Sequence, residues 1–508
     1  MVDLLRRLTA WPVRTWHRFA SRPLPVRIRT VVVVTAVVAG TAVWVGAAPS
    51  SSSSATAAAG LGTTSSAGLT SVSSASTSSR GVTSKEINVV FPVVSLNSLA
   101  GKEGFAEDAE FGEQEKAIRL FVGQINHEGG INGRRINAII STFDPTNESE
   151  MRALCKTWTE GSPAAFVVLD GVGTYTGDNE LCVTQEGHTP FIGQWTTVTK
   201  WLQLGSPYLW WTGPDQAAVL QATVDWGLSS QLLANSSQVA VIAGNRASDQ
   251  VALKNYLLPD LEAAGVTPTV ITMAADPSET ATIDAQAPLV IQQLREKGIT
   301  SVIPLIPFNV FYPLLAAETS QHYFPRLLLS DYESSIQVAL GLIPAPYAQA
   351  LNGQEGVTTE TLGGVDDDRP ESQGGYDPGV RSCWTVWHKA YPQIPPGNMS
   401  DFLEEQGPVV GWCQVIRLFA DAARGAGHDL NRRAFVTAMS RISSYPGTYS
   451  PVLAYSPDKR YGPEEYQVVR LHINEPPTSQ CKLPMNHVPQ VVCWVTVQPF
   501  TPLPTPAT

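Results

Sequence analysis

The sequence lacks the short motifs of the common hydrolase, nucleotide-binding and metal-binding families. It contains no G-x-S-x-G, no P-loop, no H-E-x-x-H and no EF-hand spacing. Its eight His are scattered, and no two lie at the spacing of metal ligands. No nucleophile–base pair or paired-carboxylate site can be assembled from the remaining residues. We therefore expect no enzyme activity, no catalytic residues, no cofactor and no metal.

Cysteine is also scarce. None precedes Cys155, which excludes a lipid-modified Cys near the N-terminus, and none forms C-x-x-C, which disfavours zinc and dithiol redox chemistry. An even number of Cys in an exported protein indicates disulfides. Six Cys allow 15 pairings. Their order along the chain favours Cys155–Cys182, Cys383–Cys413 and Cys481–Cys493.

The N-terminus predicts export. Residues 1–29 contain seven Arg, one Asp and no Lys, and residues 30–48 form an uncharged apolar run. About 20 such residues span a bilayer, and the positive flank places the N-terminus in the cytoplasm. The run is either a transmembrane anchor or a signal h-region cleaved near residues 55–57. Its length favours an anchor at the extracytoplasmic face of the cell membrane; cleavage would give a secreted protein.

Composition and charge limit the structure and the partners that the remainder of the chain can have. Residues 49–84 are mostly Ser, Ala, Thr and Gly, which predicts a flexible linker because little apolar surface can be buried. The whole chain has a net charge of −11 and residues 1–29 carry +6, so the exported remainder carries −17. This acidic balance argues against a nucleic-acid partner.

From Glu86 onward, strand-like and helix-like patterns alternate. This alternation predicts an α/β fold of parallel sheets covered by helices on both faces. A first set of predicted strands covers 87–94, 136–141, 165–169, 189–192 and 208–212, with helices at 109–126 and 148–160. A second set has strands at 239–243, 267–273, 301–305 and 326–329, with helices at 216–233, 248–264, 288–297 and 309–320. The chain is then expected to return to the first set through a strand at 355–357 and helices at 381–391, 409–426 and 432–442, before short strands and Pro-rich turns over 445–500.

The stretch Ile125–Arg135 reads I-N-H-E-G-G-I-N-G-R-R. Gly129-Gly130 supplies the positive φ that ends a helix, and Asn132-Gly133 supplies a tight turn into the next strand. Together with Asp144-Pro145-Thr146 and the following helix that carries Cys155, this stretch resembles the type I periplasmic binding proteins. The resemblance is to their branched-chain amino acid (Leu/Ile/Val) branch, the solute receptors of ABC importers, and runs from about Glu86 to about Pro446.

The resemblance implies two Rossmann-like lobes joined by a multi-crossing hinge, after an N-terminal transmembrane or signal helix. It also implies the Cys155–Cys182 disulfide, which is characteristic of that branch. We expect a basic cytoplasmic segment at 1–29, an apolar segment at 30–48 and a linker at 49–84. Lobe one is expected at 85–213, lobe two at 214–337 and the return to lobe one at 338–450. A C-terminal tail follows at 451–508.

The same resemblance implies the ligand contacts. In lobe one, the loop after the third strand offers exposed N–H groups and hydroxyls at Gly173, Thr174 and Thr176. The loop after the fourth strand offers Trp195, Thr196 and Thr197, of which Thr197 aligns with the family's ligand-binding threonine. The threonines can instead cap helices, and Trp195 can fill the lobe.

Further predicted contacts come from the other strand ends. Ser95 follows the first strand. In lobe two, Ser248 stands where the family often has an aromatic residue, and Phe308 lies near another family aromatic position. Asp331 aligns with the acid that pairs with a ligand ammonium group, although it can also cap a helix. Since Gly173, Ser248 and Glu110 depart from the family pattern, we do not expect this chain to inherit the specificity of that branch.

The sequence therefore predicts a monomeric, exported solute-binding protein that closes around a small ligand and delivers it to the membrane subunits of an ABC importer. An amino acid, an amide or a small carboxylate is the expected ligand class. The alternative is a membrane-anchored sensor that uses the same clamp without transport. Neighbouring permease and ATPase genes would favour the importer, and a neighbouring kinase gene the sensor.

Overall fold

The computed structural model describes residues 79–95, 114–173, 175, 179–194, 197–332, 348–361, 378–392, 407–473 and 492–505. The predicted basic segment, the apolar segment at 30–48 and most of the linker lie outside these ranges. Within them, no helix combines the length and the hydropathy that a membrane span requires.

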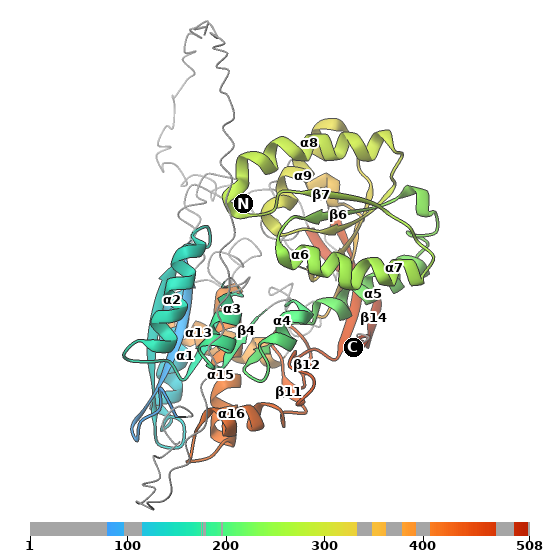
Figure 1. Ribbon diagram of the computed structural model, residues 1–508. Coiled ribbons are helices and arrows are strands. Elements are labelled where there is room, and N and C mark those ends of the chain that lie inside the picture. Colours follow the sequence, from blue (N-terminus) through green and yellow to red (C-terminus); the bar gives the residue numbers. More distant parts are fainter. Residues whose placement is uncertain are drawn as a thin grey trace, which may run out of the picture. The chain divides into compact units, whose positions relative to one another are not determined.

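The first sheet contains only parallel strands, in the order β2-β1-β3-β4-β5. Its helices come from two separate parts of the chain, and Figure 1 shows the orange helices of the later part among the blue and teal elements of the earlier one. The strands are β1 (Glu86–Val94), β2 (Arg135–Phe143), β3 (Val167–Leu169), β4 (Phe191–Gly193) and β5 (Leu209–Trp211). The helices are α1 (Gln114–His127), α2 (Glu148–Glu160), α3 (Asn179–Leu181), α4 (Thr199–Leu204), α13 (Pro378–Ala390), α15 (Gly407–Gly425) and α16 (Arg432–Met439).

The second sheet has the order β14-β13-β10-β9-β8-β6-β7, with β13 and β14 antiparallel to the strands beside them. Its strands are β6 (Val239–Gly244), β7 (Thr269–Met273), β8 (Ser301–Leu305), β9 (Arg326–Ser330), β10 (Glu355–Thr358), β13 (Glu465–Ile473) and β14 (Val492–Pro502). Its helices are α5 (Gln216–Ser229), α6 (Ala247–Ala252), α7 (Leu258–Ala263), α8 (Thr280–Glu296), α9 (Phe308–Gln321) and α11 (Ala348–Leu351). Two short strands, β11 (Tyr445–Pro446) and β12 (Val452–Leu453), pair with each other. The predicted α/β fold with parallel sheets is confirmed.

Two predictions about chain order are wrong. The strand at Glu355–Thr358 pairs in parallel with β9, so it belongs to the second sheet and the return to lobe one begins after it. The C-terminal region was expected to hold only short strands, but β13 and β14 have 9 and 11 residues and extend the second sheet. Both the sheet that β10 joins and the extension of that sheet by β13 and β14 depend on pairing between strands that are distant in sequence. Local sequence patterns do not encode such pairing.

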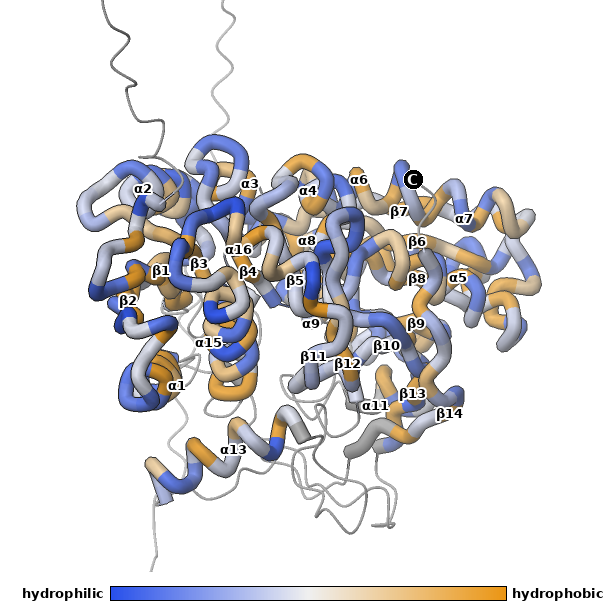
Figure 2. Tube along the Cα trace, turned by 90° about the horizontal axis from the view of Figure 1, so that it is seen from below, coloured by the Kyte–Doolittle hydropathy of each residue, from blue (hydrophilic) through white to orange (hydrophobic). Residues whose placement is uncertain are grey.

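Burial explains why the central strands are almost purely apolar. Every residue of β6 and of β8 is buried, as parallel strands covered on both faces require. In lobe one, α1 packs beside α15, and both carry hydrophobic residues in Figure 2. Phe121 on α1 and Phe419 on α15 are buried in the same core cluster. Residues about 300 positions apart in sequence therefore build one lobe.

Two of the three disulfides suggested by the order of the Cys are present. Cys155–Cys182 joins α2 to the helical turn after α3, and Cys383–Cys413 joins α13 to α15. The third suggested pair includes Cys481, which lies outside the described residues.

The turn at Ile125–Arg135 forms as its sequence predicts. Gly129, Gly130, Asn132 and Gly133 all have positive φ, and the Gly130 N–H donates to the Ile125 carbonyl at 2.9 Å, closing α1. The Asn132 side chain donates to the carbonyl of Arg424 at 3.2 Å. The turn thus joins the start of β2 to the end of α15, where the later part of the chain completes lobe one.

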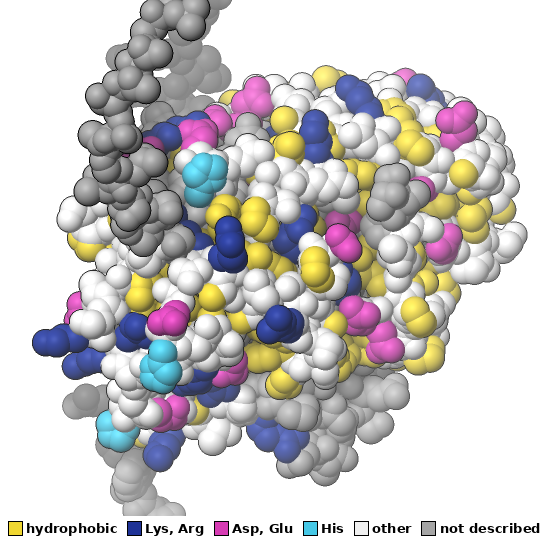
Figure 3. All heavy atoms as spheres, turned by 60° about the horizontal axis from the view of Figure 1, so that its bottom comes forward, with side chains coloured by type: hydrophobic (Ala, Val, Ile, Leu, Met, Phe, Trp, Pro, Cys, Tyr) yellow, Lys and Arg dark blue, Asp and Glu magenta, His cyan; other side chains and the backbone are white. Residues whose placement is uncertain are grey.

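Charged side chains of both signs are interspersed over the face shown in Figure 3. That face carries no broad basic patch of the kind that binds a nucleic-acid backbone.

The two glycines of the turn allow a matched test. An alanine costs about 1 kcal/mol at either position because φ is positive at both. At Gly130, the new Cβ would also lie 2.0 Å from the carbonyl oxygen of Arg134, whereas at Gly129 nothing lies within 4 Å. We expect Gly130→Ala to lower the free energy of unfolding by about 1–3 kcal/mol more than Gly129→Ala, as measured by urea denaturation. Equal losses would show that this contact does not constrain the turn.

Candidate functional site

The carboxyl ends of parallel strands meet at one edge of a sheet, and ligands of open α/β sheets bind beyond that edge. In the first sheet, the residues that follow β3 and β4 are Asp170 and Gln194. In the second sheet, Asn245, Ile306 and Asp331 follow β6, β8 and β9. The candidate site is therefore built from polar groups at these strand ends.

Asp170 organises the loop after β3. Its carboxylate is fully buried and accepts N–H groups of Val172, Gly173 and Tyr175 at 3.1, 2.8 and 2.8 Å. The family resemblance implied exposed N–H groups in this loop. For Gly173 that expectation is wrong, because its N–H donates to a carboxylate of the same chain. The N–H groups of this loop are thus directed at a side chain of the same chain.

Four predicted contacts of lobe one, Thr174, Thr176, Trp195 and Thr196, lie outside the described residues, and their roles stay predictions. Ser95 lies at the end of β1, half-buried, and its N–H donates to the carbonyl of Phe143 at 2.8 Å. Beside it, Gln114 at the start of α1 donates through Nε2 to the carbonyl of Val94 at 3.1 Å. The Oε1 atom of Gln114 is buried without a hydrogen-bond partner.

Thr197 is buried and lies where the chain leaves lobe one. Its N–H donates to the carbonyl of Pro214 at 3.2 Å, and its own carbonyl accepts the N–H of Gln216 at 2.9 Å. These bonds pair Thr197 with Asp215 as neighbouring parallel strands would. Thr197 therefore has a structural role at the crossing, and its ligand role stays a prediction.

Gln194 was not predicted as a contact, although it directly follows β4. Its side chain is 2 % exposed, and neither Oε1 nor Nε2 has a hydrogen-bond partner within the described part of the chain. A buried polar group without a partner costs about 1–3 kcal/mol, so such groups are rare in folded proteins. The feature of the sequence that could have identified Gln194 as a candidate contact is its primary amide, placed immediately after a buried strand.

In lobe two, the predicted contact Ser248 is followed by a buried acid, Asp249. Asp249 is fully buried and accepts Nε and Nη2 of Arg246 at 2.9 and 2.7 Å, together with the hydroxyl of Tyr332. Ser248 itself is half-buried in α6. The polar cluster at the end of β6 thus consists of Arg246, Asp249 and Tyr332. From this loop, only Ser248 was predicted as a ligand contact.

Asp331 lies at the end of β9, as predicted, and is 6 % exposed. Its Oδ2 accepts the N–H of Thr359 at 2.7 Å and the Thr359 hydroxyl at 2.9 Å. Burial raises the pKa of Asp331 to about 6, against the opposing effect of hydrogen bonds from Thr358 and Thr359. Its pairing with a ligand ammonium group stays a prediction.

The first residue of α9 is the predicted contact Phe308, which follows the end of β8. Next to it, Asn309 is 1 % exposed and donates through Nδ2 to the carbonyl of Ala275 at 3.3 Å. Its Oδ1 is buried without a partner. An unpartnered amide oxygen therefore occurs at the strand ends of both lobes.

No group of three or more His, Cys, Asp or Glu side chains in the described ranges could hold a metal ion.

Comparison with known proteins identifies the fold family. The family model described as periplasmic binding protein matches residues 99–474. The chain belongs to this family. The resemblance inferred from Ile125–Arg135 to the type I proteins of its branched-chain amino acid branch is confirmed.

Solved structures of periplasmic binding proteins share the fold at low sequence identity. A solute-binding protein of an ABC transporter from Rhodopseudomonas palustris, in complex with 3,4-dihydroxybenzoic acid, is 12 % identical with a TM-score of 0.58, covering 83 % of this chain and 98 % of its own. A branched-chain amino acid ABC transporter protein from Thermus thermophilus with bound valine is 12 % identical with a TM-score of 0.57, covering 83 % and 97 %. A fatty acid ABC transporter substrate-binding protein from Thermomonospora curvata is 17 % identical with a TM-score of 0.55, covering 84 % and 97 %. No curated protein sequence matches this chain.

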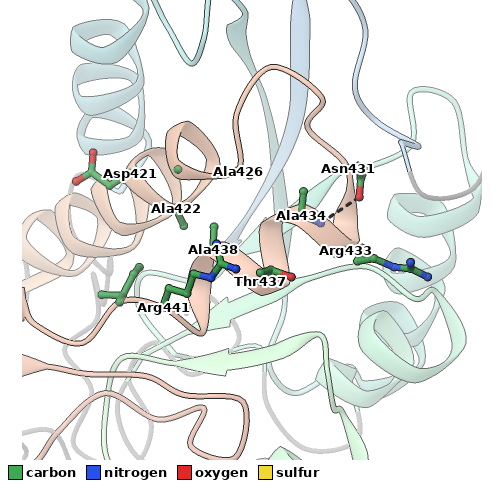
Figure 4. A pocket seen from close by; sticks show the side chains of 11 residues that line it. Asp421, Ala422, Ala426, Asn431, Arg433, Ala434, Thr437, Ala438 and Arg441 are labelled. Atoms are coloured by element: carbon green, nitrogen blue, oxygen red, sulfur yellow. Dashed lines mark hydrogen bonds between the residues drawn. The ribbon is translucent and has the colours of Figure 1, made fainter.

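A pocket of about 510 Å³ lies elsewhere in this periplasmic binding protein, between α15 and α16. Figure 4 shows Asp421, Ala422 and Ala426 on one side of it and Thr437, Ala438 and Arg441 on the other. Gly411, near the strand ends, precedes Ala422 by 11 residues on α15, about 16 Å along the helix axis. The pocket is therefore at the opposite end of lobe one from the candidate site.

The crossing residue Asp215 predicts a pH dependence of stability. Its buried carboxylate caps α5 through the N–H groups of Ala217 and Ala218 and accepts the hydroxyl of Thr199 at 2.7 Å. Burial raises its pKa to about 6, above the value near 3.9 of an unfolded chain. The folded state therefore holds this proton more tightly, and the resulting stabilisation is complete below about pH 4 and is lost as the pH rises through 6.

We expect Asp215→Asn to remove this contribution, since asparagine caps a helix without titrating. Between pH 4 and pH 7, the free energy of unfolding of the wild type should fall relative to that of the variant by on the order of 2 kcal/mol. Urea denaturation of both proteins across this range measures the difference. Parallel pH profiles would contradict the assignment to Asp215.

Proposed function

We propose that this chain is an extracytoplasmic solute-binding protein that captures a small ligand between its two lobes and delivers it to the membrane subunits of an ABC importer. An amino acid, an amide or a small carboxylate is the proposed ligand class. The observation that carries the proposal is the family match over residues 99–474 on two sheets whose strand ends hold buried polar groups. The N-terminal segment 30–48 would anchor the protein, or be removed to release it.

The proposed mechanism is hinge closure. The chain passes between the two groups of elements after β5, after β10 and before β13, so only a few segments have to bend. One crossing is fixed by the pairing of Thr197 with Asp215, and another by the Trp211 N–H, which donates to the carbonyl of Arg460 at 2.8 Å. A ligand that contacts both lobes stabilises the closed form over the open one by its differential affinity.

The ligands of the structural relatives support capture of a small molecule without naming it. One of these relatives was solved with bound valine, another with 3,4-dihydroxybenzoic acid, and the third is a fatty acid transporter protein. These molecules share neither size nor charge pattern, so residues at the strand ends have to decide the ligand of this chain.

Ligand-dependent stabilisation tests the proposal. We expect at least one compound in a panel of amino acids, amides and small carboxylates to raise the thermal midpoint of the purified full-length chain. At a concentration 100 times its dissociation constant, a ligand adds about 2.7 kcal/mol to the free energy of unfolding. Thermal-shift measurement with calorimetric confirmation would detect this effect. A panel in which no compound stabilises the chain would count against a solute receptor.

The role of Asp331 has its own test. Asp331→Asn keeps an oxygen for the bonds from Thr359 but removes the charge. A charged hydrogen bond contributes about 1.5–3 kcal/mol, so an amine-bearing ligand should bind about 10–100-fold more weakly to the variant. Amine-free ligands serve as the control in the same titration calorimetry and should be little affected. Equal losses for both kinds of ligand would rule out the ammonium contact.

A further inference from the structure

The side chain of Gln194 is the group at the strand ends whose amide is left without any partner. It is 2 % exposed, and neither end of its amide has a hydrogen-bond partner among the residues that the structure describes. The other buried polar groups beside it are satisfied: Asp170 by three N–H groups, and Thr212 by the carbonyl of Gly193 at 3.1 Å. A buried amide with one acceptor oxygen and two N–H donors would be matched by a group that offers both a donor and an acceptor.

Two glycines hold this amide in place. A Cβ at Gly411 on α15 would lie 2.9 and 3.1 Å from Oε1 and Nε2 of Gln194, and 2.0 Å from the carbonyl oxygen of Gly171. A Cβ at Gly171 would lie 2.5 Å from the ring of Trp412. Because neither position has a side chain, α15 approaches the ends of β3 and β4 closely, and the amide is fixed against backbone instead of being free to turn into solvent.

The hydrogen bonds of Asp170 beside Gln194 help to select among the proposed ligand classes. Asp170 follows the neighbouring strand β3, and its carboxylate accepts the N–H groups of Val172, Gly173 and Tyr175. A ligand carboxylate at this edge would find these donors occupied. A carboxamide carries no charge, and it can form two hydrogen bonds with the amide of Gln194.

Other strand-end amides add acceptors of the same kind. Oε1 of Gln114 in lobe one and Oδ1 of Asn309 in lobe two are buried without partners, while the amide nitrogen of each donates to a backbone carbonyl. Unpartnered oxygens call for N–H or O–H donors, which a carboxamide has and a carboxylate lacks.

We infer that Gln194 is a specificity-determining residue that binds a carboxamide group of the ligand, so that this protein takes amides in preference to the corresponding carboxylates. The inference rests on the proposed function and narrows its ligand class.

The test compares acids with amides of the same carbon skeleton. The probes are acetate and acetamide, butyrate and butyramide, and benzoate and benzamide, each titrated into the full-length chain by thermal shift and calorimetry. We expect at least one amide to bind at least tenfold more tightly than its acid. Acids that bind as tightly as their amides, or more tightly, would overturn the inference while leaving the proposed function in place.

The variant Gln194→Met keeps the length of the side chain and removes the amide. It should raise the dissociation constant of the best amide at least tenfold, while the thermal midpoint without ligand stays equal or rises, because an unpartnered buried amide is gone. Gln194→Leu is the second variant if methionine disturbs folding. Gln203→Leu, on the exposed surface of α4, is the control and should bind the amide as the wild type does.

The outcomes separate the two proposals. If the wild type binds an amide and Gln194→Met binds it equally well, Gln194 is a structural core residue and the inference fails while the solute receptor stands. If the wild type binds none of the six probes and nothing in the wider panel, both proposals fail together. If the wider panel yields only ligands without a carboxamide, the receptor stands and the amide preference is overturned.

Discussion

The polar groups at the ends of buried parallel strands are the constraint on which this structure depends. A strand covered on both faces ends in a region poor in water, so each polar side chain there needs a hydrogen-bond partner. Asp170 obtains backbone N–H groups, Asp249 obtains Arg246 and Tyr332, and Asp331 obtains Thr359. These bonds shape the loops after β3, β6 and β9, which are the loops that a ligand of this fold would meet.

The second constraint is that lobe one is incomplete without the later part of the chain. Helix α15 packs beside α1, approaches Gly171 and Gln194 through Gly411, and accepts a hydrogen bond from Asn132 at its far end. The Cys383–Cys413 disulfide ties α13 to the same helix. Lobe one therefore closes only after lobe two has been traversed, which makes the crossing segments obligatory connections between two bodies. In the proposed hinge closure, the bending falls on these connections.

Local patterns in the sequence were sufficient for the elements and for the family. Helix Glu148–Glu160 and strand Ser301–Leu305 have the predicted bounds because apolar periodicity and caps are local signals. The sheet that receives Glu355–Thr358 could not be read in this way, since its partner β9 is fixed by tertiary packing. The site shows the same division. Asp331 was found through the family pattern, whereas Gln194 stands out only when burial and missing partners are known.

This difference bears on how far family membership determines the ligand. Recognition of an amino acid in the related branch relies on donors for a carboxylate and an acid for an ammonium group. In this chain, the N–H of Gly173 is bound to Asp170, and Oδ2 of Asp331 already accepts two bonds from Thr359. Among the described residues, the amide oxygens of Gln114, Gln194 and Asn309 have no hydrogen-bond partner. Family membership thus gives the fold, while the polar groups at the strand ends have to decide the ligand.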